Sequence, residues 1–115
     1  LPKYRGLLPI FYALLNNEKT FGVTVHYMDG KLDSGPIIIQ EELLIGEKVN
    51  LLDLYPMAFR SAGKLLNKAI DSIESKTVDT IFNDPTQKTY YSFPNQNSVL
   101  QYKKKIKNNK GPNPL

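Results

Sequence analysis

Two residues in the first third of the chain carry side chains suited to acid–base chemistry, Asp33 and His26. Asp33 lies in a short polar stretch between two apolar runs, and Gly35 just after it allows tight backbone geometry. A carboxylate held in such a loop can act as a general base or orient another group. It can also be a plain turn aspartate that hydrogen-bonds its own backbone, and the local pattern alone favours this second interpretation.

His26 is the single histidine of the chain, and an imidazole changes its charge near neutral pH. It falls in a stretch with strand character, where Thr24, His26 and Met28 share one face. A lone histidine in a strand is usually a packed or hydrogen-bonded residue, so the residues alone assign it no role. With one histidine and no cysteine, disulfides, thiolate metal sites and histidine-rich zinc sites are excluded, and we expect no metal.

The elements that must position these residues alternate between helix and strand. Pro9 suits the first position of a helix that ends near residues 16–17. The β-branched and aromatic residues of 21–28 predict a strand. A second strand is predicted from Ile37 to about Ile45, and its continuous apolar start indicates burial on both faces. The two strands are expected to pair antiparallel across the loop that carries Asp33.

A long amphipathic helix is predicted after the second strand. Asn50 and Asp53 have the spacing of a capping box. Pro56 predicts either a kink or a true start one turn later. Apolar residues then recur at helical spacing up to Ile73. These elements predict an α/β fold, with a C-terminal tail from residue 81 onwards that is irregular.

The composition indicates a single small globular domain. There is no apolar run of about 20 residues that would cross a bilayer and no signal peptide, so a cytoplasmic protein is expected.

The net charge of +4 comes from the predicted tail, residues 81–115, since the 10 basic and 11 acidic residues outside its five-lysine cluster nearly cancel. That cluster could bind phosphates, and nearby tyrosines could stack on bases, although a solvated terminus is more typical. The residues concerned are Lys103, Lys104, Lys105, Lys107 and Lys110, with Tyr90, Tyr91 and Tyr102.

Three motifs occur in order: LPKYRG at residues 1–6, GVTVHYMD at 22–29 and LDSG at 32–35. Together they resemble the 10-formyltetrahydrofolate-dependent formyltransferases, which include methionyl-tRNA, phosphoribosylglycinamide and sugar-nucleotide enzymes. The resemblance implies that residues 1–80 are the C-terminal part of the catalytic domain, the distal part of a Rossmann-like fold whose N-terminal half is missing here. It implies the transfer of a formyl group from 10-formyltetrahydrofolate to a primary amine.

The resemblance also implies roles for individual residues. The family uses an Asn, a His and an Asp, and the Asp corresponds to Asp33. The Asn and His belong to an NxHxSxLP motif whose last two residues match positions 1–2, so both are absent from this chain and we expect the chain alone to be inactive. His26 corresponds to a separate position. The loop from Asp29 to Asp33, comprising Asp29, Gly30, Lys31, Leu32 and Asp33, is expected to bind the pterin of the folate through its backbone.

Tyr4 and Arg5 are candidates for placing the acceptor, because an arginine suits phosphate recognition. A loop-bracing role for Arg5 is an equal alternative. The histidine within the 22–29 motif resembles the sugar-nucleotide enzymes, so an amino-sugar nucleotide is the expected acceptor. A fragment of a methionyl-tRNA formyltransferase is one alternative, and a non-catalytic remnant with a nucleic-acid-binding tail is the other. No membrane partner is expected.

Overall fold

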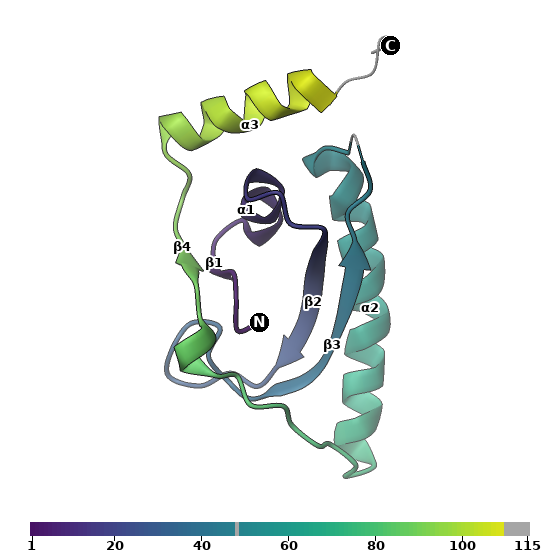
Figure 1. Cartoon of the computed structure of the whole chain (residues 1–115). Coiled ribbons are helices and arrows are strands. Elements are labelled where there is room, and N and C mark those ends of the chain that lie inside the picture. Colours follow the sequence, from purple (N-terminus) through teal and green to yellow (C-terminus); the bar gives the residue numbers. More distant parts are fainter. Residues whose placement is uncertain (48, 110–115) are drawn as a thin grey trace.

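The computed structural model describes residues 1–47 and 49–109 (Figure 1). It confirms the predicted α/β class, with helices and short sheets alternating along the chain. The elements are β1 (Arg5–Gly6), α1 (Pro9–Leu15), β2 (Thr20–His26), β3 (Ile37–Leu44), α2 (Leu51–Glu74), the 3-10 helix η1 (Pro85–Gln87), β4 (Tyr90–Tyr91) and α3 (Gln96–Asn109). No helix of the described part is long and apolar enough to cross a bilayer.

The predicted antiparallel hairpin is confirmed. β2 and β3 pair in a register that runs from Thr20 opposite Leu44 to His26 opposite Ile37, with an irregularity between Val25 and His26. The hydrogen bond from Tyr27 N to Pro36 O, 2.9 Å long, closes the pairing just beyond the strands. The hairpin therefore delivers the Asp33 loop at one defined end of the sheet.

Helix α2 begins with the predicted capping box. Asn50 Oδ1 accepts from Asp53 N at 3.2 Å, and Asp53 Oδ2 accepts from Asn50 N at 2.8 Å. These bonds satisfy backbone donors that a helix N-terminus otherwise leaves free. Because the helix starts at Leu51, the alternative that Pro56 marks a true start one turn later is wrong. Pro56 is accommodated inside the helix, where it removes one backbone hydrogen bond.

The core lies where α1, α2 and the hairpin meet. Five consecutive residues of α1, from Ile10 to Leu14, are buried. Three of them, Ile10, Ala13 and Leu14, pack with Phe21 of β2 and the fully buried Leu54 of α2. The apolar start of β3 is only partly enclosed: Ile37 is fully buried, whereas Ile38 and Ile39 are half-buried. Figure 1 shows α2 running along one face of the hairpin.

The C-terminal segment differs from the prediction. An irregular tail was expected over 81–115, but η1, β4 and α3 give most of it regular structure. β4 pairs in parallel with β1, and Ile81 forms an isolated bridge with Ile37. The prediction of an irregular tail is therefore wrong for these elements, and the segment is bound to the body of the fold. Residues 110–115, the end of the predicted tail, lie outside the described residues.

Helix α3 docks through its less polar side. Val99, Tyr102 and Ile106 follow a helical spacing and are half-buried. The Tyr102 hydroxyl accepts a hydrogen bond from Leu51 N at 2.8 Å, at the start of α2. The Lys105 ammonium donates to the Leu14 carbonyl oxygen in α1, and burial lowers the pKa of this lysine. Three lysines at 103, 104 and 107 remain exposed.

Candidate functional site

Asp33 lies in the β2–β3 loop with a left-handed backbone, φ 54°. Its Oδ2 accepts a hydrogen bond from Gly6 N at 2.8 Å, and its Oδ1 lies 3.7 Å from His26 Nε2. The side chain of Asp33 is 27% exposed. The carboxylate is thus fixed by one backbone donor and remains open to a ligand, which suits a group that accepts or orients a proton.

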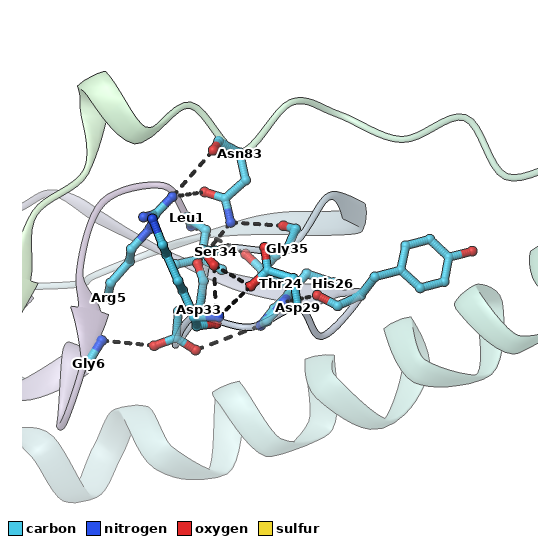
Figure 2. Close-up of polar contacts among 12 residues, drawn as sticks. Leu1, Arg5, Gly6, Thr24, His26, Asp29, Asp33, Ser34, Gly35 and Asn83 are labelled. Atoms are coloured by element: carbon cyan, nitrogen blue, oxygen red, sulfur yellow. Dashed lines mark hydrogen bonds and ion pairs between the residues drawn. The ribbon is translucent and has the colours of Figure 1, made fainter.

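His26 comes from the end of β2 and faces the same carboxylate (Figure 2). Its Nδ1 lies 2.8 Å from the carbonyl oxygen of Tyr27. Because a carbonyl oxygen only accepts, Nδ1 carries the hydrogen and Nε2 points towards Asp33. The sequence assigned no role to this histidine, and the structure brings it beside the candidate catalytic residue.

The loop predicted to bind folate is held by its own side chains. Asp29 Oδ1 accepts from Lys31 N at 2.9 Å and from the Ser34 hydroxyl. These hydrogen bonds, that of Ser34 first, lower the pKa of the Asp29 carboxyl. The side chain of Asp29 therefore shapes the loop, and residues 29–32 are exposed. The Lys31 backbone is engaged within the loop, since its N–H donates to Asp29 Oδ1 and its carbonyl oxygen accepts from the Ser34 hydroxyl at 3.1 Å. The binding of folate by residues 29–33 stays a prediction.

Tyr4 and Arg5 have different surroundings. The Tyr4 hydroxyl donates to Glu18 Oε1 at 2.7 Å, and burial, followed by the interaction with Glu18, raises its pKa to about 12. Tyr4 lines the cavity described below, so its predicted role stays a prediction. Arg5 is 5% exposed, and its Nη2 donates to Asn83 Oδ1 at 2.8 Å. This geometry favours the loop-bracing alternative for Arg5 over acceptor binding.

Asn83 is the site residue that sequence reasoning missed. It was assigned to the tail, yet its side chain is buried and contacts both Arg5 and the Asp33 loop (Figure 2). The only sequence signal is an asparagine before Asp84-Pro85, a pattern that usually indicates a turn. Its partners are 48 to 78 positions away, so no local pattern reveals them.

A cavity of about 820 Å³ lies beside Asp33. Asp33 and His26 line it together with the N-terminal segment and one face of the hairpin. The backbone nitrogen of Leu1 lies in the same cavity, 3.4 Å from Thr24 Oγ1. Both the open carboxylate and the first residue of the chain therefore face one space.

Comparison with known proteins identifies the family. A sequence model described as formyl transferase matches residues 1–81. A methionyl-tRNA formyltransferase from Flavobacterium psychrophilum is 34% identical over 108 residues, which cover 92% of this chain and 34% of the relative. The chain spans 29% to 34% of the length of the first two curated relatives.

Two solved structures share the fold. An N-formyltransferase from Helicobacter canadensis, in complex with folinic acid and dTDP-3-aminofucose, matches 80% of this chain and 34% of its own, with TM-score 0.75 and 33% identity. A formyltransferase from Anoxybacillus kamchatkensis, in complex with UDP-4,6-dideoxy-4-formamido-L-AltNAc and tetrahydrofolate, matches 92% of this chain and 59% of its own, with TM-score 0.76 and 25% identity. The expected partial Rossmann-like α/β domain is confirmed, and the chain belongs to the formyl transferase family.

Proposed function

We propose that this chain is the distal part of a cytoplasmic N-formyltransferase that uses 10-formyltetrahydrofolate to formylate the primary amine of an amino-sugar nucleotide. The observation that carries the proposal is the Asp33 carboxylate. It is anchored by Gly6 N, faces His26 and opens into a cavity. Family membership supports formyl transfer. The nucleotide sugars bound to two similar structures support the acceptor.

Asp33 would manage the protons of this reaction. The donor supplies a formyl group, the acceptor nitrogen bonds to its carbon, and the bond from that carbon to the folate nitrogen breaks. The acceptor loses one proton, and the folate nitrogen gains one. A carboxylate that is partly exposed and held at one oxygen can accept the proton from the amine and orient a catalytic imidazole. The exposed residues Gly30, Lys31 and Leu32 lie in the same loop as Asp33 and would contact the pterin of the folate.

The geometry also supports an upstream half. In the family motif, the catalytic His precedes the residue equivalent to Leu1 by four positions, and four residues span at most about 14 Å. Since Leu1 N lies in the cavity beside Thr24, residues before it would enter the space that Asp33 faces. One side of α2 further exposes Phe59, at 71%, and Leu66, at 51%, to solvent. An upstream half would cover such apolar surface.

Methionyl-tRNA is the second candidate acceptor. It is favoured by the curated relatives, of which two are 34% and 37% identical and carry that name. The two acceptors are distinguished by assaying formylation of an amino-sugar nucleotide and of methionyl-tRNA side by side. A longer protein that formylates neither amine in the presence of the folate would refute the proposed function.

The reading frame before Leu1 tests the proposal most directly. We expect it to continue into a strand-and-helix half that ends in Asn-x-His-x-Ser before Leu1. Sequencing the parent gene upstream of this position gives the answer. A start codon directly before Leu1 would instead identify the chain as a remnant and leave Asp33 without catalytic partners.

The 115-residue chain alone is predicted to transfer no formyl group, because the motif that supplies the Asn and His is absent from its sequence. Formation of tetrahydrofolate by the purified chain, with an amino-sugar nucleotide present, is the measurement. The longer protein serves as the positive control. A rate above the uncatalysed background would contradict the assignment of the oxyanion-stabilising groups to the upstream half.

A further inference from the structure

The buried amide of Asn83 makes three hydrogen bonds to two segments that are remote in sequence. Nδ2 donates to the carbonyl oxygens of Asp33, at 2.8 Å, and Gly35, at 2.9 Å. Oδ1 accepts from Arg5 Nη2 at 2.8 Å. Asn83 is 4% exposed. Both donor hydrogens and the acceptor are thus used, in a place where an unmet polar group is costly.

The loop that Asn83 holds needs support. Asp33 has a positive φ, a conformation that side-chain-bearing residues adopt sparingly and that persists only where the surroundings fix it. The two carbonyl groups bound by Asn83 flank Ser34, one on either side, so the amide closes the loop directly behind Asp33. Figure 2 shows Asn83 on the opposite side of this loop from the Asp33 carboxylate.

Arg5 orients the amide. Its guanidinium donates only, so the Asn83 oxygen must face Arg5 and the Asn83 NH₂ must face the loop. Arg5 Nη2 also lies 3.3 Å from the Asn83 backbone oxygen, so it holds both ends of the residue. Arg5 immediately precedes Gly6, whose N–H binds the Asp33 carboxylate. The segment Arg5–Gly6 therefore holds Asp33 at two points. Gly6 N binds its carboxylate, and Arg5, through Asn83, holds its backbone carbonyl group.

We propose that Asn83 is the positioning residue of Asp33: it holds the backbone of the Asp33 loop so that the carboxylate faces Gly6 N and His26. Its role in turnover rests on the proposed function. Asn83 touches none of the reacting atoms and acts through Asp33. An asparagine is required because the position needs two donated hydrogens towards the loop and one acceptor towards Arg5.

The kinetic test uses the longer protein with Asn83→Ala, Asn83→Asp and the matched control Asn97→Ala, on the exposed side of α3. Misplacement of a reacting group by about 1 Å can cost about 100-fold. We therefore expect kcat to fall by about 100-fold in both Asn83 variants while KM for the acceptor stays unchanged. Asn83→Asp keeps the size of the side chain and the oxygen that accepts from Arg5, so this variant decides the test if Asn83→Ala does not fold.

Coupling to Asp33 separates positioning from general stability. In the Asp33→Asn background, Asn83→Asp should cost less than about threefold in kcat, because residues that act as one unit are non-additive. A full additional loss of about 100-fold in that background would overturn the proposal. An unchanged kcat in the single Asn83 variants would overturn it as well.

Amide hydrogen exchange gives a readout that does not depend on activity. Residues 29–35 should exchange about tenfold faster in Asn83→Asp than in the wild type, whereas α2 and the Asn97→Ala control should be unchanged. Unaltered exchange in this loop would overturn the proposal even if turnover fell. A wild-type longer protein with no formyl transfer would refute the proposed function, and the exchange result would still decide whether Asn83 holds the loop.

Discussion

Replacing Asp33 by Asn in the longer protein is expected to lower kcat by about 1,000-fold and leave the fold intact. General acid–base catalysis by one side chain contributes about 100- to 10,000-fold, and a neutral amide cannot accept the proton that a carboxylate accepts. Asn has nearly the same shape as Asp, and its oxygen can still accept from Gly6 N, 2.8 Å away in the native structure. The loop should therefore keep its conformation.

The measurement is steady-state formyl transfer together with thermal unfolding. KM for the acceptor and the unfolding midpoint should both stay near the wild-type values. Asp71→Asn is the matched control, because Asp71 is exposed on α2 and lies outside the residues that line the cavity. Near wild-type turnover in Asp33→Asn would contradict the catalytic assignment. A large fall in the unfolding midpoint would mean that the carboxylate is mainly structural.

Local patterns predicted the elements that depend on neighbouring residues. The Asn50–Asp53 capping box is formed within four residues, and it appears as predicted. The hairpin was predicted because β-branched stretches and the intervening loop are contiguous. Its second strand ends at Leu44, one residue before the expected end, and its first ends at His26, two residues early. Such boundary differences arise because pairing, rather than propensity, ends a strand.

Helix α3 was not predicted because its many lysines make the helical spacing of its apolar residues hard to recognise. Four of its residues are lysines, and the segment was therefore interpreted as a solvated tail. A local signal was present: Asn95 caps the helix by accepting from Ser98 N at 2.8 Å, and Val99, Tyr102 and Ile106 mark its packed side. Tertiary contact supplies the rest, since the Tyr102 hydroxyl satisfies the backbone nitrogen of Leu51 at the start of α2.

In the candidate site, too, the residues within local motifs were predicted and the long-range contacts were not. The resemblance predicted Asp33 and the 29–33 loop, because these lie within or between two neighbouring motifs. It did not reveal that Asn83, 50 positions after Asp33, closes the loop, or that His26 lies beside the carboxylate. The β2–β3 hairpin brings His26 and Asp33 together, and Asn83 reaches the loop where Ile81 pairs with Ile37. Spacing along a sequence carries no information about such a contact.

Replacing Gly35 by Ala is expected to destabilise the loop severely. A Cβ at this position would lie 1.6 Å from the carbonyl oxygen of Tyr27 and 2.6 Å from its carbonyl carbon. Both are backbone atoms of the residue that follows β2, so no side chain can rotate away, and the loop or the strand must shift. Overpacking of this kind costs about 3 kcal/mol. The expected result is a fall of this size in the free energy of unfolding, measured by urea denaturation.

Gly30→Ala is the matched control for this change. It is the same substitution in the same loop, but a Cβ there meets nothing within 4 Å, so stability should change by less than about 0.5 kcal/mol. Equal stability of the two variants would mean that the loop does not press against Tyr27. Gly35→Ala should also displace the carbonyl group that Asn83 binds. Comparison with Asp33→Asn then separates the need for the carboxylate from the need for the loop conformation. Asp33→Asn removes the carboxylate and leaves the loop intact, whereas Gly35→Ala distorts the loop and leaves the carboxylate in place.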